Sequence, residues 1–95
     1  MPKVRWLPRA LKDLERLYGF IHEKNPNAAI KALAFIKQSA ITLETFPEIG
    51  ILCHQDRAFR DLLAPFGHGV YVLRYRIDKN QDVIITRVWH SKELR

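Results

Sequence analysis

The chain has 95 residues, 47% of them hydrophobic and 27% charged, and its formal net charge is +6. This length and balance predict one folded domain over residues 1–95 and exclude a disordered or low-complexity chain. The single cysteine, Cys53, excludes an internal disulfide. No segment resembles a membrane span or a signal peptide, so we expect a cytoplasmic protein that does not bind a membrane. The positive charge favours an acidic protein or a nucleic acid as partner.

The N-terminal part of the sequence predicts a short strand followed by a helix. Residues 3–7 are β-prone, and alternation places Val4 and Trp6 on one face. From Pro8 to about Lys24, apolar residues recur at three- and four-residue spacing, which is the stripe of an amphipathic helix. A proline suits the first turn of such a helix.

A second helix is predicted directly after the sequence NPN. Asn25 can cap the new helix, and Pro26 suits its first position. The apolar periodicity then continues to about Thr45, where Phe46-Pro47 ends it. Two helices joined by so short a connection are expected to form an antiparallel hairpin.

The rest of the chain is rich in strand signals. Residues 47–56 form the longest irregular stretch. Residues 57–63 read as a strand and 64–69 as a turn with two glycines. Two further strands are predicted, 70–77 and 83–90, with a hairpin turn between them.

Alternation within the last two strands separates apolar from basic residues. One face of the strand 70–77 should pack on the helices; it consists of Tyr71, Leu73, Tyr75 and Ile77. Arg74 and Arg76 share the opposite face. Arg87 and Trp89 share one face of the last strand. The order strand, helix, helix, strand, strand, strand predicts an α+β domain. Its helical hairpin should cover one face of a largely antiparallel sheet of three to four strands and leave a basic face open.

Several stretches together resemble the ParE/RelE superfamily of toxins from type II toxin–antitoxin systems. They are WLPRALKDLERLYGFI, NPNAAIKALAFI, LETFPEIG, FGHGVYVLRYRID and VIITRVWHSKE, which occur in the same order over nearly the whole chain. The resemblance implies a compact bacterial toxin that a cognate antitoxin neutralises. An antitoxin of this superfamily wraps round its toxin with a helix or strand. Phe20 and Phe35 lie off the main helical stripes, so they are either exposed contacts for the antitoxin or peripheral core.

The superfamily has two branches with different targets. ParE-like members bind and poison DNA gyrase, whereas RelE-like members cleave mRNA on the ribosome. RelE-like nucleases typically have an arginine where this chain has Val72 and another near Ser91, and no tyrosine follows Tyr75 here. FGHGVY and HSKE resemble the ParE-like branch. The resemblance therefore implies a toxin that inhibits gyrase by binding, with the ribosome-dependent endoribonuclease as the alternative and an inactive homologue or basic nucleic-acid-binding module as a weaker one.

The two functions would use the basic C-terminal half differently. Cleavage of RNA needs a base, an acid and cations for the phosphorane charge. His90 would be the acid, Glu48 or Glu93 the base, and the phosphate-stabilising cations would be Arg60, Arg76 and Arg87. A binding toxin would instead contact its target through Arg74, Arg76, Arg87, Trp89, His90, Lys92 and Arg95.

Each of these residues also has a purely structural interpretation. The arginines can be solvated charges on an open sheet face, Trp89 a packed aromatic, and His90 a strand-end histidine bonded to backbone. The other histidines, His22, His54 and His68, lack metal-ligand spacing. We expect no metal and no cofactor.

Overall fold

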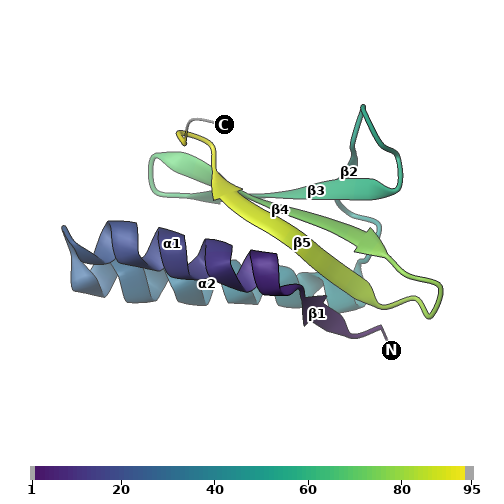
Figure 1. Cartoon of the computed structure of the whole chain (residues 1–95), viewed down its shortest axis with the longest axis horizontal. Helices are drawn as coiled ribbons and strands as arrows, with labels where there is room; N and C mark the ends of the chain where they lie inside the picture. Colours follow the sequence, from purple (N-terminus) through teal and green to yellow (C-terminus); the bar gives the residue numbers. More distant parts are fainter. Residues whose placement is uncertain (1, 94–95) are drawn as a thin grey trace.

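The computed structural model describes residues 2–93, which form a two-layer α+β domain (Figure 1). In chain order the elements are β1 (Val4–Trp6), α1 (Pro8–His22), α2 (Pro26–Thr45), β2 (Ile51–Leu52), β3 (Phe59–Phe66), β4 (Gly69–Ile77) and β5 (Val83–His90). The two helices lie side by side on one face of the sheet, and no helix of the described chain covers the other face (Figure 1). The predicted helical hairpin on a sheet is confirmed.

The sheet has five strands in the order β1-β5-β4-β3-β2. β1 runs parallel to β5, and the other neighbours are antiparallel. The sheet has five strands and not the expected three to four, because β2 lies within 47–56, a stretch predicted to be irregular. β2 pairs only with Arg60 and Asp61 of β3, so two residues are enough to extend the sheet.

The β3–β4 hairpin is tighter than the sequence suggested. The turn expected over 64–69 shrinks to Gly67 and His68, because β3 continues to Phe66 and β4 begins at Gly69. Gly67 has φ 63°, a conformation that favours glycine. Pro65 stays within β3 because β2 pairs only with Arg60 and Asp61, so among residues 2–93 no strand lies beside Pro65 on that side of β3. A proline is tolerated on such a free edge.

The helix limits follow the predicted signals. Pro8 and Pro26 are the first residues of α1 and α2. The Asn25 side chain accepts a hydrogen bond from the Ala28 N–H at 3.1 Å, which caps α2 as expected. Neither helix in residues 2–93 has the length and apolar character needed to cross a bilayer.

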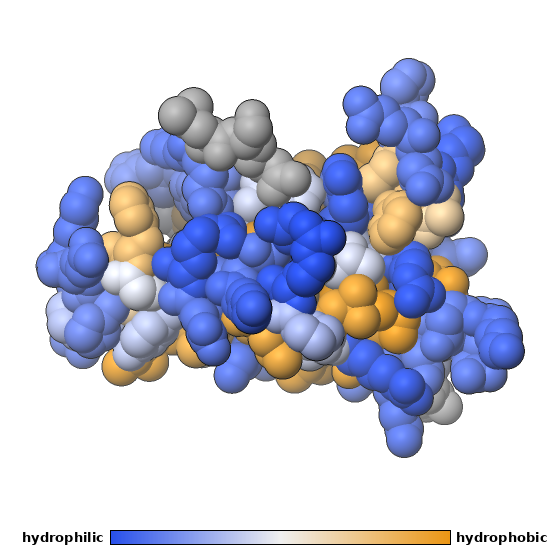
Figure 2. All heavy atoms as spheres, in the orientation of Figure 1, coloured by the Kyte–Doolittle hydropathy of each residue, from blue (hydrophilic) through white to orange (hydrophobic). Residues whose placement is uncertain are grey.

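The core lies between the helices and the facing side of the sheet. Tyr75 is fully buried, and its hydroxyl donates to the Pro47 carbonyl and accepts from the Gly50 N–H. The largest fully buried side chains are Tyr75, Ile36, Leu43, Leu73, Ile85, Val83 and Val88. The molecular surface, by contrast, is mostly hydrophilic on the face shown in Figure 2, with smaller hydrophobic patches between the polar side chains.

A β-bulge in β5 decides which residues face the helices. Arg74 pairs with Arg87 but Tyr75 pairs with Ile85, so Thr86 is an extra residue in β5. Before the bulge Ile85 is buried in the core, and after it Val88 takes that place. Residues of directly opposed pairs share a face. Arg87 therefore lies with Arg74 on the open face, although unbroken alternation would have placed it with Ile85.

Candidate functional site

The open face of the sheet is centred on Arg74. Its guanidinium donates to both carboxylate oxygens of Asp61, at 2.8 and 2.9 Å. It also lies over the Trp89 ring, with Cζ 5.0 Å from the ring centroid. The hydrogen bonds to Asp61 raise the pKa of Arg74 above its ordinary value, and the negative charge of Asp61 offsets the positive charge of the guanidinium. Arg74 is thus held in one orientation between an acid and an aromatic ring.

An apolar strip crosses the same face beside Arg74. Val72 pairs with Leu63 on one side and with Trp89 on the other. Val72 is buried, whereas the Leu63 side chain is about half exposed. Where the nuclease branch would place an arginine, the surface is therefore hydrophobic.

A wide, open hollow of about 770 Å³ lies over this face. Its lining combines apolar side chains with basic ones, among them Ile51, Phe59, Leu63, Arg74, Arg76 and Arg87. Arg76 is directly opposite Phe59 on β3, and it forms no ion pair within residues 2–93. Arg9 also lines the hollow and, like Arg76, forms no ion pair in this part of the chain.

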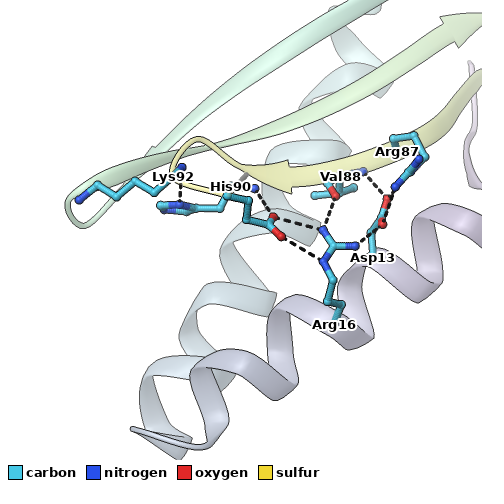
Figure 3. A network of polar contacts seen from close by, with 7 residues as sticks. Asp13, Arg16, Arg87, Val88, His90 and Lys92 are labelled. Atoms are coloured by element: carbon cyan, nitrogen blue, oxygen red, sulfur yellow. Dashed lines mark hydrogen bonds and ion pairs between the residues drawn. The ribbon is translucent and has the colours of Figure 1, made fainter. Parts of the chain in front are cut away.

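Arg87 lines the hollow, but its guanidinium binds a buried carboxylate on α1. Its Nε donates to Asp13 Oδ2 at 2.9 Å and its Nη2 to Oδ1 at 3.3 Å. Asp13 also accepts from the Val88 backbone N–H and from Arg16 (Figure 3). Burial raises the pKa of the Asp13 carboxyl, but the hydrogen bonds from Arg87, Val88 and Arg16 outweigh it and lower the pKa below its ordinary value.

The sequence predicted no role for Asp13 or Arg16 and gave Glu93 only as a candidate base, but the three together organise this edge of the sheet. Arg16 contacts both carboxylates, with Asp13 on its own helix and Glu93 beyond β5 (Figure 3). A signal was present in the sequence, since Asp13 lies within the apolar stripe of α1, next to Leu14. A charged residue in such a stripe requires a partner of opposite charge.

His90 lies on the other side of the sheet from these arginines. It pairs with the buried Tyr71, and the two rings meet edge to face at 5.0 Å. The ring covers Gly69 so closely that a Cβ there would collide with it. Its Nδ1 accepts the Lys92 backbone N–H at 3.1 Å. A histidine ring that accepts a hydrogen bond through Nδ1 carries its proton on Nε2.

The remaining predicted residues are spread over the molecule. Arg60 pairs with the core residue Tyr75, and its Nη1 donates to the carbonyls of Glu48 and Gly50. The Lys92 side chain extends away from the network (Figure 3). Arg95 lies outside the described residues. The structure thus brings together Arg74, Arg76, Arg87 and Trp89, and it brings neither His90 nor Arg60 to them.

Residues 2–93 offer little support for a metal site or for a reactive cysteine. They contain no group of three histidine, cysteine, aspartate or glutamate side chains placed to hold a metal ion. Cys53 lines the hollow, but burial raises the pKa of its thiol, which disfavours a reactive thiolate.

The comparisons with known proteins agree with this fold. A family model, "ParE toxin of type II toxin-antitoxin system, parDE", matches residues 4–95. The toxin RelE3 of Caulobacter vibrioides is 35% identical over 95 residues and is covered over 100% of both chains. The toxin RelE1 of the same organism is 32% identical over 87 residues, which are 92% of this chain and 90% of that protein.

A solved structure, the chromosomal ParDE TA system from P. aeruginosa, has the same fold. It matches with a TM-score of 0.77 at 20% identity, over 93% of this chain and 94% of the other. A toxin of such a system has an antitoxin as its partner. The chain belongs to the ParE toxin family of type II toxin–antitoxin systems.

Proposed function

We propose that this toxin inhibits DNA gyrase by binding it and trapping its DNA-cleaved state, without covalent chemistry of its own. The observation that supports this most is the separation of the candidate acid from the candidate cations. His90 lies on the helix side of the sheet, whereas the candidate cations Arg76 and Arg87 lie on the open face. The third candidate cation, Arg60, donates to the carbonyls of Glu48 and Gly50 instead. An acid and a phosphate-stabilising cation must reach the same phosphate.

The open face has the character of a binding surface. It presents an exposed apolar side chain, Leu63, beside the stacked pair of Arg74 and Trp89. Aromatic and arginine side chains next to apolar ones are typical of the residues that contribute most to protein–protein binding. Arg76 and Lys92 would add charge complementarity to an acidic target.

A supercoiling assay with the host's own gyrase tests the proposal. Excess purified toxin should stop supercoiling and produce linear DNA after detergent and protease treatment, because the cleaved complex is trapped. Arg76→Gln should weaken this effect. Lys31→Gln, which removes the same charge from the exposed side of α2, should not. Normal supercoiling at saturating toxin would refute gyrase as the target.

A second candidate function is cleavage of mRNA on the ribosome. The two Caulobacter relatives are named RelE toxins, and Lys92 lies beside His90. His90→Ala should then abolish toxicity in a protein that still folds, and mapping of mRNA ends after induction should reveal new cuts. Toxicity that survives His90→Ala, with intact mRNA, would eliminate this function.

A further inference from the structure

The free edge of β5 needs partners that no strand supplies. β1 pairs with residues 83–85 only and then leads into α1. Beyond Ile85, no strand formed by residues 2–93 lies beside β5 on that side, since β1 is the last strand of the sheet. The backbone groups of Val88 and the N–H of His90 would therefore be left unpaired, at a cost if they are buried.

Side chains take the place of the missing strand. Asp13 Oδ2 accepts the Val88 N–H at 2.8 Å, and Arg16 Nη2 donates to the Val88 carbonyl at 3.2 Å. Glu93 Oε1 accepts the His90 N–H at 2.7 Å. Arg16 then joins the two acids, because its Nε and Nη2 donate to Glu93 at 3.1 and 3.2 Å. One arginine fork thus links α1 to the segment after β5 (Figure 3).

The same contacts fix the turn that follows β5. The Glu93 N–H donates to the His90 carbonyl, and the Lys92 N–H donates to His90 Nδ1. Ser91 holds the turn from the other side, since it exchanges hydrogen bonds with the Val70 backbone through its N–H and its Oγ. Every backbone N–H from His90 to Glu93 is therefore bonded. Within the described chain, the fork of Arg16 on Glu93 is the ion pair that fastens this turn to α1.

The ion pair between Arg16 and Glu93 is partly exposed to solvent, so it can orient the turn without adding much to the stability of the fold. The Arg16 side chain is 43% exposed and that of Glu93 31% exposed. Ion pairs with this much solvent contact contribute little to folding. Asp13 keeps Arg87 and the Val88 N–H when Arg16 is lost. Removal of the fork should consequently free the turn from α1, while Ser91 still joins it to Val70, and leave the core folded.

We propose that Arg16 is a positioning residue for target binding: through Glu93 it holds the His90–Lys92 turn so that Lys92 meets the target in one fixed geometry. This inference rests on the proposed binding function and goes beyond it. Arg16 need not touch the target itself. Its effect is on the entropy of binding: a turn that is already held in the bound geometry loses less conformational freedom when the target binds.

The test compares Arg16→Gln, Glu93→Gln and the double variant with the wild type. Lys12→Gln is the matched control, because it removes the same charge from the exposed side of α1 one turn earlier. Each single variant should raise the toxin concentration for half-maximal gyrase inhibition about tenfold, a loss of about 1.4 kcal/mol of binding. The double variant should be no weaker than the weaker single, because both act through one contact. Arg16→Lys should recover part of the loss.

Two further readouts exclude a merely structural effect. The melting temperatures of the variants should stay within about 5 °C of the wild type. The amide proton of His90 should shift upfield and exchange faster, and the ring should no longer be held as the Nε2–H tautomer. Wild-type potency in Arg16→Gln and Glu93→Gln would overturn the proposal, and so would a potency loss that simply follows the melting temperature.

Growth arrest on expression without antitoxin separates failure of this inference from failure of the gyrase proposal. If the wild type arrests growth but spares gyrase, gyrase is wrong as the target. The positioning role is then upheld if Arg16→Gln relieves the arrest and Lys12→Gln does not, and it is overturned if both arrest equally. A wild-type protein that neither inhibits gyrase nor arrests growth overturns both proposals.

Discussion

The Asp13 carboxylate accepts a hydrogen bond from the backbone N–H of Val88 at 2.8 Å, although 75 residues separate the two in the chain. The bond joins a helix side chain to the free edge of the last strand. An exposed strand edge invites pairing with other chains, and proteins commonly block it with charged side chains. In this toxin α1 blocks the edge of β5 through Asp13 and Arg16.

Loss of the Asp13 charge should destabilise the fold. Asp13→Asn leaves Arg87 and Arg16 without their shared carboxylate next to the core, which should lower the free energy of unfolding by about 2–4 kcal/mol. Glu15→Gln, an exposed change two residues later in α1, should stay within about 0.5 kcal/mol. Denaturant unfolding of both variants measures the difference. Equal stability would mean that the network contributes nothing.

Stability should fall in acid through the same network. Burial raises the pKa of Glu93, but the hydrogen bonds from Arg16 and the His90 N–H lower it below its ordinary value, as happens for Asp13. Both acids thus titrate at a lower pH in the folded protein than in the unfolded chain, where carboxyl pKa values are about 4. Their contribution is complete above about pH 5 and is lost as the pH falls through the folded values.

The measurement follows unfolding of the wild type and of Asp13→Asn from pH 7 to pH 3. The stability gap between them should narrow as the pH falls, because protonation removes the charge that the variant lacks already. Arg16 and Arg87 are the charged groups facing Asp13, and they stay protonated throughout. A gap that stays constant with pH would contradict the assigned role of the carboxylate.

Arg74 and Arg76 should respond differently to the same substitution. Arg74→Gln removes a bidentate pair with Asp61 and the stacking on Trp89, and should cost about 1–2 kcal/mol of stability. Arg76→Gln breaks no ion pair of the described chain and should change stability by less than about 0.5 kcal/mol. Its effect should appear in target inhibition. Thermal unfolding next to the supercoiling assay tests both, and an Arg76→Gln variant with full potency would remove Arg76 from the binding surface.

Gly69 should be essential for the position of His90. The side chain in Gly69→Ala would collide with the His90 ring, so the ring must turn away and release the Lys92 N–H. We expect weaker growth arrest and a changed His90 tautomer by nitrogen NMR. Gly19→Ala is the control, because a Cβ there meets nothing within 4 Å and should stabilise α1 by about 0.5–1 kcal/mol. An unchanged tautomer in Gly69→Ala would show that the ring does not depend on this glycine.

The predicted helices agree with the structure because their signals are local. Pro26 and the cap of Asn25 act within one turn of α2, and the apolar stripe records which side is buried. The same holds for Tyr71 and Tyr75 on β4, which lie in the core as alternation predicts. Phe20 is exposed, whereas Phe35 packs against the core beside Phe66, and the spacing alone did not separate them. A role of Phe20 in antitoxin binding stays a prediction.

The sequence by itself determined the fold class, the helix limits and the toxin family, because short-range patterns and a resemblance along the whole chain carry them. Only the tertiary structure decided which residues meet at the candidate site. The extra residue Thr86 turns Arg87 and Trp89 to the open face and His90 to the helix side, because a one-residue shift of this kind exchanges the faces of a strand. Asp13 then draws the Arg87 guanidinium round the sheet edge, a contact between residues far apart in the chain that no local pattern records.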